Sequence, residues 1–385
     1  MTLHKPDLAQ SLAAVARPIG EANGLPNALY TDEVLAEAER AQVFFASWAA
    51  IGFAHEVANP GDVKPLTFLG QPLLLVRDRE AVLRVFLNVC RHRGMKLVHE
   101  ACNLPRAIRC PYHSWCYELD GKLRTTPHVG GPGTNRHDCI DRATLGLVEV
   151  RSAAWLGTVF VNLDGNAPAF DDYAAEAKAR WAEFDRPYHH GGADSSFTLE
   201  VQANWKLAVE NYCESYHLPW VHPGLNSYSR LEDHYHIEAA GFSGQGTTVY
   251  RPMLSVDGQR FPVIPGLAGK WEEGAEYIAL YPNVLLGVHK DHAFAIVLEP
   301  KGVATTHEHV AIMYPDAAVA GPDFEVMRAR NAAMWKEVFE EDIFVVEGMQ
   351  AGRHAAGFDG GRFSPAMDGP THAFHRWIAA QLGTA

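Results

Sequence analysis

Four side chains with metal-binding chemistry fall into two short segments of the sequence. Cys90 and His92 are separated by one residue, Cys110 and His113 by two, and seventeen residues lie between the two pairs. Two thiolates and two imidazoles suit either a structural zinc ion or a 2Fe-2S centre in which histidines replace two cysteines on one iron. Because each segment supplies one ligand of each kind, the arrangement favours the iron–sulfur centre, and a zinc-stabilised interaction module is the alternative.

A second group of potential ligands lies in the segment NWKLAVENYCESYHLPWVHPG, residues 204–224. A helix that begins at its first residue would place Glu210, Glu214 and His217 on one face, at about 100° per residue. His222 follows His217 by five residues, a spacing that separates the two side chains on a regular helix. Two prolines in this stretch require the helix to end or bend, so the two imidazoles are expected to converge from the helix end and the following loop.

The third ligand of such a site is expected in the C-terminal helix, PDFEVMRARNAAMWKEVFEEDIFVVEGMQAG. Asp342 falls in the middle of its apolar stripe, whereas other acids of the helix lie off it. A carboxylate facing the core needs a cation, either an Arg or Lys side chain or a metal. Because His217 and His222 lack a third ligand, metal is the better explanation: two histidines and one carboxylate form the facial triad of non-haem Fe(II) oxygenases.

These motifs resemble those of a known family. The Cys90-x-His92 and Cys110-x-x-His113 pairs match the Rieske iron–sulfur motif, and PYHSWCYELDG resembles its surroundings in ring-hydroxylating oxygenases. NWKLAVENY followed by E-x-x-H and x4-H, and EEDIFVVEGMQ followed by GRFSP, resemble the catalytic segments of the same family. Over nearly its whole length the chain resembles the terminal-oxygenase α subunit of the Rieske non-haem iron oxygenases. The resemblance implies a 2Fe-2S cluster and a mononuclear Fe(II), held respectively by Cys90, His92, Cys110 and His113 and by His217, His222 and Asp342.

The resemblance also assigns roles to residues around the mononuclear iron. Glu214 would be the acid that links His113 of a neighbouring subunit to His217, and so carries electrons between subunits. Many ring-hydroxylating members have Asp at this position. A Glu here resembles the residue found in members that oxidise quaternary ammonium compounds. Glu210 and Asn211 would orient the iron ligands.

Electrons must come from another protein. No GxGxxG phosphate loop follows a strand, so NAD(P)H is expected to act indirectly, through a flavin reductase and/or a ferredoxin. O2 would be the co-substrate, and the family's usual assembly implies a homotrimer in which each cluster faces a neighbour's iron. Basic residues surround the cluster ligands in the sequence: Arg91, Arg93, Lys96, Arg106 and Arg109. Their positive charge would help hold a negatively charged cluster and attract an acidic donor protein. An ordinary solvent-exposed basic surface explains them equally well.

The substrate is expected to be a small molecule. The Glu214 signature and the many aromatic residues favour hydroxylation of an N-methyl group of a quaternary or methylated amine, which leads to demethylation. Ring hydroxylation of an aromatic acid or hydrocarbon is the alternative, and a protein confined to electron transfer is a further one. The aromatic residues available for a pocket are Tyr212, Tyr216, Trp220, Tyr228, Tyr235, Phe242, Tyr250 and Phe294.

An α+β fold is expected to position these groups. Short apolar runs separated by Gly, Pro and Asp predict an all-β module over residues 44–165, which the resemblance identifies as the Rieske domain. Helical patterns flank it, giving an N-terminal helical segment over 1–43 that packs on a catalytic domain over 166–385. By resemblance, that domain has a helix-grip (Bet v1/START-like) fold with an antiparallel sheet.

Composition restricts the partners. The chain has 385 residues, of which 33 are Lys or Arg and 46 are Asp or Glu, a formal charge of −13. Such a balance argues against nucleic acid or an anionic membrane as a partner. No apolar run approaches the roughly 20 residues needed to cross a bilayer, and the first residues lack the features of a secretion signal. The cytoplasm is therefore the expected location.

Overall fold

The computed structural model describes residues 8–252 and 254–383 and divides the chain into two compact units. The first unit contains the chain up to Ala50, the short stretch Trp155–Gly157 and the chain from Asn166 onward. The second contains Ile51–Ala154 and Thr158–Gly165. A β unit thus interrupts a larger mixed unit along the sequence, which confirms the expected α+β fold class.

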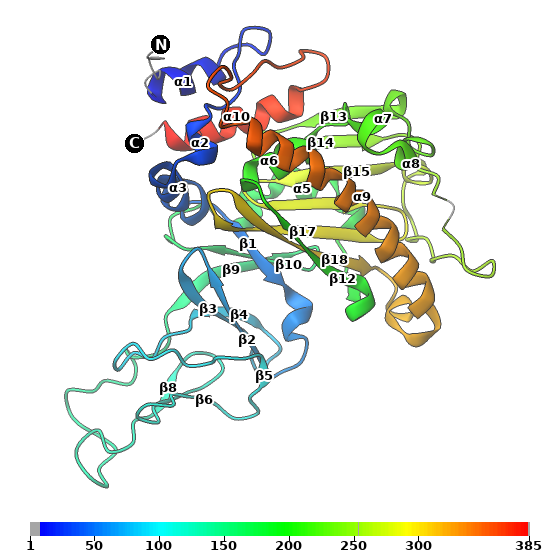
Figure 1. Cartoon of the computed structure of the whole chain (residues 1–385). Coiled ribbons are helices and arrows are strands. Elements are labelled where there is room, and N and C mark those ends of the chain that lie inside the picture. Colours follow the sequence, from blue (N-terminus) through cyan, green and yellow to red (C-terminus); the bar gives the residue numbers. More distant parts are fainter. Residues whose placement is uncertain (1–7, 253, 384–385) are drawn as a thin grey trace. The chain divides into compact units, whose positions relative to one another are not determined.

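The second unit is built from two sheets (Figure 1). The larger has seven strands in the order β1-β10-β9-β4-β3-β2-β5, and the smaller has three in the order β6-β7-β8. The strands are β1 (Ala49–Phe53), β2 (Asp62–Phe68), β3 (Gln71–Arg77), β4 (Leu83–Leu87), β5 (Cys102–Asn103), β6 (Ile108–Arg109), β7 (Cys116–Tyr117), β8 (Leu123–Thr125), β9 (Glu149–Trp155) and β10 (Thr158–Asn162).

Tight turns explain this sheet. Strands β2 and β3 pair from Phe68 opposite Gln71, so only Leu69 and Gly70 form the turn, with φ of 46° and 80°. Positive φ at both positions matches the twist of the flanking strands, and glycine adopts it without strain. The apolar side chains between the sheets form one core that includes both cysteines of the Cys–His pairs, Cys90 and Cys110.

The first unit contains an antiparallel sheet of eight strands. Its path is β11-β18-β17-β16-β15-β14-β13, and β12 pairs with β18 beside β11. The strands are β11 (His189–His190), β12 (Ser196–Val201), β13 (His234–Glu238), β14 (Phe242–Thr247), β15 (Ala275–Leu280), β16 (Val284–Val288), β17 (Ala293–Gly302) and β18 (Thr305–Tyr314).

Helix α9 crosses this sheet, as Figure 1 shows. Buried residues recur along it every three or four positions, including Asn331, Trp335, Phe339 and Val346, so one face packs against the sheet. Asp342 lies on the same face, as the apolar stripe predicts. The α-helices are α1 (Leu8–Val15), α2 (Ala28–Thr31), α3 (Glu33–Glu39), α4 (Phe170–Tyr173), α5 (Ala175–Arg180), α6 (Trp205–Cys213), α7 (Leu218–Val221), α8 (Pro223–Asn226), α9 (Glu325–Gly352) and α10 (Gly369–Leu382).

The N-terminal helices belong to the first unit. The Leu25 amide donates to Nδ1 of His375 on α10 over 3.0 Å, and the Tyr30 hydroxyl donates to Glu210 on α6 over 2.5 Å. These buried contacts join the start and end of the described chain to the helix that precedes His217. Across residues 8–252 and 254–383, no helix combines the length and apolar character that a membrane span requires.

Candidate metal centres

The two Cys–His segments fold into loops with the same backbone pattern. In each, the cysteine amide donates to the carbonyl five residues later (2.8 Å), and the amide four residues after the cysteine donates back to the cysteine carbonyl (3.0 Å). The donors of the second bond are Gly94 and Ser114, and both have positive φ, 72° and 58°. Each loop therefore reverses within five residues, fixing Cys90 or Cys110 at its base and leaving a histidine at its tip.

The side chains of the two loops approach one another. The rings of His92 and His113 lie 4.6 Å apart between centroids, while Cys90 and Cys110 are 2% and 1% exposed. Burial raises the pKa of the Cys90 thiol, so a thiolate there requires nearby positive charge such as a metal. His113 Nδ1 is buried and has no hydrogen-bond partner among the described residues, as expected of a ligand atom. The donor set and this unpartnered nitrogen fit a 2Fe-2S cluster with two histidine ligands.

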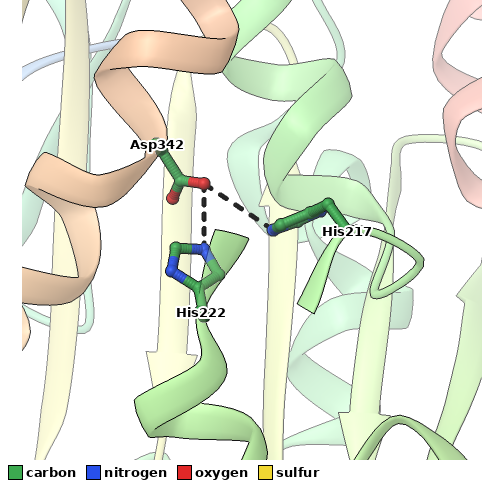
Figure 2. A group of neighbouring side chains, drawn as sticks. All are labelled: His217, His222 and Asp342. Carbon is green, nitrogen blue, oxygen red and sulfur yellow. Dashed lines mark ion pairs between the residues drawn. The ribbon is translucent and has the colours of Figure 1, made fainter. Parts of the chain in front are cut away.

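The second centre brings together residues far apart in the sequence. Figure 2 shows His217, His222 and Asp342 pointing toward one another. Asp342 Oδ1 lies 2.9 Å from His222 Nε2 and 3.6 Å from His217 Nε2, and one ligand atom from each residue lies within 4.8 Å of the others. The arrangement fits a mononuclear iron with two imidazole ligands and one carboxylate ligand.

A break in the helix creates this convergence. Asn204 caps α6 by accepting from the Lys206 amide, and α6 ends at Cys213. Glu214 is already extended, with φ −120° and ψ 161°. The expectation that Glu210, Glu214 and His217 share one helical face is therefore wrong, because the chain leaves the helix before Glu214.

Two carboxylates orient the imidazoles. His217 Nδ1 donates to Glu214 Oε1 and His222 Nδ1 donates to Glu341 Oε2, each over 2.7 Å. Since a carboxylate only accepts, both rings carry a proton on Nδ1, which leaves Nε2 as the ring nitrogen that faces Asp342 and would bind the metal. The sequence reasoning missed Glu341; its adjacency to Asp342 was the only available signal.

The two residues expected to orient the ligands behave differently. Asn211 Nδ2 donates to Asp342 Oδ1 over 3.1 Å, so it contacts an expected iron ligand directly. Glu210 instead pairs with Arg353 (3.3 Å) and His375 (3.1 Å) and accepts from Tyr30. These contacts join α6 to the N- and C-terminal segments, and the ligand-orienting role expected of Glu210 stays a prediction.

Comparison with known proteins identifies the family. Residues 179–384 match the model of the ring hydroxylating alpha subunit (catalytic domain), and residues 47–139 match that of the Rieske [2Fe-2S] domain. The chain belongs to the Rieske ring-hydroxylating oxygenases. As a member of this family it is an oxidoreductase that uses a 2Fe-2S cluster, a mononuclear iron and O2, so the zinc-module and electron-transfer-only alternatives are set aside.

Relatives of this oxygenase include enzymes named for quaternary amines. The carnitine monooxygenase oxygenase subunit of Escherichia coli (strain K12) is 30% identical over 88% of this chain and 87% of its own length. The glycine betaine monooxygenase oxygenase subunit of Pseudomonas aeruginosa (strain PAO1) is 26% identical over 93% and 89%. A solved structure of the quaternary ammonium Rieske monooxygenase CntA shares the fold, with a TM-score of 0.77 at 24% identity over 96% of this chain and 98% of its own. Naphthalene 1,2-dioxygenase from Rhodococcus sp. shares it equally, with a TM-score of 0.77 at 17% identity over 98% and 99%.

The Rieske oxygenase fold leaves a pocket beside the three iron-ligand candidates. Its aromatic wall comes from three elements and consists of Tyr212 on α6, Tyr277 and Phe294 on the sheet, and Trp335 and Phe339 on α9. Of the aromatic residues expected from the sequence, only Tyr212 and Phe294 line this pocket, while Tyr216 and Trp220 are exposed. Trp335 and Phe339 could have been found, because they precede Asp342 by seven and three positions on one helical face.

One further carboxyl group lies near Asp342. Glu308 on β18 lines a small cavity with Asp342 and Asn211. Burial raises the pKa of Glu308 to about 8, and the charge of Asp342 acts in the same direction. Glu308 is therefore a protonated acid at neutral pH, and nothing in the sequence pattern singled it out.

Proposed function

We propose that this Rieske oxygenase is a terminal oxygenase that hydroxylates an N-methyl group of a quaternary or methylated amine. The observation that carries the proposal is the carboxylate–imidazole pair at the mononuclear centre, in which Glu214 rather than aspartate contacts His217. The two relatives named for carnitine and glycine betaine, each aligned over most of the chain, support the same substrate class.

The proposal assigns each site residue a role. The 2Fe-2S ligands are Cys90, His92, Cys110 and His113, and the mononuclear iron ligands are His217, His222 and Asp342. We further propose an N-terminal segment over 1–43, a Rieske domain over 44–165 and a catalytic domain over 166–385. When bound, the cluster supplies electrons one at a time and the mononuclear iron activates O2.

The residues around the mononuclear centre hold its ligands ready. Glu214 and Glu341 keep the two imidazoles in one tautomer, and Asn211 holds the carboxylate of Asp342. This preorganisation keeps the ligand atoms facing one point without reorganisation when the metal binds. The aromatic wall excludes water, and its ring faces attract a quaternary ammonium group by cation–π interaction.

Electrons are proposed to cross between subunits. In a homotrimer, Glu214 would bridge His217 of one subunit and the cluster histidine His113 of its neighbour. The cluster would be reduced by a ferredoxin or flavin reductase that draws on NAD(P)H. An acidic donor would be attracted by exposed basic residues in the cluster loops, among them Arg91, Arg93 and Arg109.

The reaction balances with two electrons from the reductase. A methyl group of the cation, O2, two electrons and two protons give the N-hydroxymethyl cation and water. Loss of formaldehyde and a proton from that cation leaves the tertiary amine. Formaldehyde release is therefore the product signal that distinguishes this reaction from hydroxylation elsewhere in the substrate.

The test is a coupled assay with purified oxygenase, a reductase and NADH. Carnitine, glycine betaine and tetramethylammonium are compared with benzoate and naphthalene, and O2 uptake, formaldehyde and hydrogen peroxide are measured together. We expect at least one amine to give formaldehyde in proportion to O2 uptake. Peroxide equal to O2 uptake with every amine, together with hydroxylated arenes, would assign the enzyme to aromatic substrates.

The aromatic alternative has one specific support. The pocket wall beside the iron ligands consists mainly of aromatic and aliphatic side chains, a lining that an arene fits as well as a methylated cation. The chlorobenzene dioxygenase subunit alpha of Cupriavidus sp. (strain PS12) is 33% identical over 49% of this chain, which is too short a match to extend its name to the whole protein.

A further inference from the structure

A second group of two histidines and a carboxylate lies on the β17–β18 hairpin, away from the iron-ligand candidates. His307 and His309 are two residues apart on β18, so strand geometry points both side chains to the same face. Glu299 on β17 pairs with His307 in register, and Glu200 on β12 pairs with His307 from the other side. We refer to Glu299, His307 and His309 as the hairpin cluster.

The ligand atoms of the hairpin cluster are close enough to share an ion. One atom from each of its three residues lies within 4.8 Å of the others. His309 Nε2 is 2.8 Å from Glu299 Oε2, and His307 Nε2 is 3.7 Å from Glu200 Oε2. Bond lengths of about 2.0–2.2 Å to zinc place neighbouring ligand atoms roughly 3.3 Å apart, so small side-chain rotations suffice.

Neighbouring side chains already hold part of this geometry. Gln202 donates to the other oxygen of Glu200 over 2.7 Å, which leaves Oε2 directed at His307. Thr198 lies opposite His309 in register and 3.4 Å from its Nδ1, so Nε2 is the nitrogen left to face Glu299. The residues of the hairpin cluster and their neighbours thus lie on three adjacent strands, and the pairing register of these strands sets their relative positions.

The site is accessible and carries one competing cation. The side chains of Glu299, His307 and His309 are 17%, 31% and 37% exposed. Lys301 lies 2.6 Å from Glu299 Oε1 and is 40% exposed, so it can move into solvent when a divalent ion arrives. A surface ion pair of this kind contributes little stability and offers little resistance.

We propose that the hairpin cluster is a binding site for a divalent transition-metal ion of the zinc class. Two imidazoles with one carboxylate suit Zn²⁺, Ni²⁺ or Cu²⁺ and not Mg²⁺ or Ca²⁺, which prefer all-oxygen ligands. Glu200 provides a fourth ligand, which completes a tetrahedral set for Zn²⁺. A bound metal would link β12, β18 and β17, the three strands that carry its ligands.

The experiment is a zinc chloride titration of the iron-loaded holoenzyme, followed by calorimetry and metal analysis. We expect the wild-type chain to bind one zinc more than the variant carrying both His307→Gln and His309→Gln, with no loss of iron from either. His99→Gln, which removes an exposed histidine outside the hairpin cluster, should bind zinc like the wild type. Equal zinc uptake by the double variant and the wild type would overturn the proposal.

Two further measurements keep the result independent of folding. The double variant should retain the visible spectrum of the cluster and the Tm of the zinc-free wild type, and only the wild-type Tm should rise with zinc. Lys301→Met should tighten zinc binding by up to about fivefold, because it removes the competing ion pair. Weaker binding in Lys301→Met would contradict the proposed site, because removal of a competing cation cannot weaken zinc binding to Glu299.

Discussion

The first unit contains two groups of two histidines and a carboxylate that differ in what surrounds them. At the mononuclear centre His217 and His222 are 16% and 3% exposed, and each Nδ1 donates to a carboxylate. In the hairpin cluster the histidines are 31% and 37% exposed, and the contact at His309 Nδ1 is a threonine hydroxyl. Donor types alone therefore do not distinguish a catalytic centre from a surface site; burial and the carboxylates behind the ligands do.

The two groups also differ in how the chain assembles them. Neighbouring strands in register bring the hairpin cluster together. The mononuclear centre needs the start of α7, the start of α8 and the middle of α9 to meet. A site built from three separated elements depends on the packing of the whole unit, so its variants are expected to have the larger effects.

Removal of the carboxylate ligand should have the largest effect. Asp342→Ala leaves two imidazoles and an unfilled ligand position, so we expect loss of mononuclear iron and of substrate oxidation, with the 2Fe-2S spectrum unchanged. Iron analysis and product formation measure this. Glu340→Ala, on the exposed side of the same helix, is the matched control and should behave as wild type. Normal iron content in Asp342→Ala would exclude Asp342 as a ligand.

Glu214 and Glu341 form a matched pair, since each accepts from a proposed ligand histidine over 2.7 Å. Glu214→Ala should retain both metals when iron is supplied, yet turn over substrate very slowly because the proposed path from the neighbouring cluster is broken. Single-turnover product yield from prereduced enzyme is the measurement. A normal rate in that experiment would remove the bridging role.

Glu341→Ala should have the smaller effect of the two. Loss of a carboxylate behind a metal-binding histidine typically lowers metal affinity by about 10–100-fold. We expect turnover to recover at saturating Fe(II), because Glu341 has no part in the proposed electron path. Iron titration with activity as the readout separates the two carboxylates, and failure of Glu341→Ala to recover would place both in the same role.

A Glu210 variant tests whether this buried residue supports iron binding or only the stability of the fold. Glu210→Gln weakens a buried pair with Arg353 and His375, and breaking such a pair typically costs about 3–5 kcal/mol. We expect a lower Tm with unchanged iron affinity, measured by calorimetry and iron titration. A specific loss of iron affinity without a change in Tm would instead support the ligand-orienting role predicted for Glu210.

Glu308 gives the smallest expected effect and a dependence on pH. Its pKa of about 8 in the folded protein exceeds the ordinary value of 4.5, because burial disfavours the charged form. Between these values the unfolded chain ionises Glu308 while the folded protein keeps it protonated, so folding stability falls as pH rises. Glu308→Gln removes this penalty, and its stability relative to wild type should rise by about 1–3 kcal/mol from pH 6 to 8. Equal Tm differences at both pH values would contradict the raised pKa.

The sequence predicted much of this molecule because its signals are local. The Cys–His pairs fold into two equivalent loops, and the position of Asp342 in the apolar stripe of α9 follows from helical periodicity alone. Glu214 and His217 do not share a helical face with Glu210, because the helix stops at Cys213 and the residues after it no longer follow the helical repeat. Glu341 and Glu308 could not be found, since each acquires its neighbour only when distant elements pack together.

Strand β18 carries the tripeptide His307-Glu308-His309 with its outer members facing one side and its middle member the other. A slip of one residue in pairing would carry two imidazoles to the side of Asp342 and leave the buried acid in solvent. The side chains on the two faces of β18 therefore both require the same pairing register with its neighbouring strands. Insertions or deletions in the β17–β18 loop should be tolerated only where they keep His307 and His309 on one face of the sheet and Glu308 on the other.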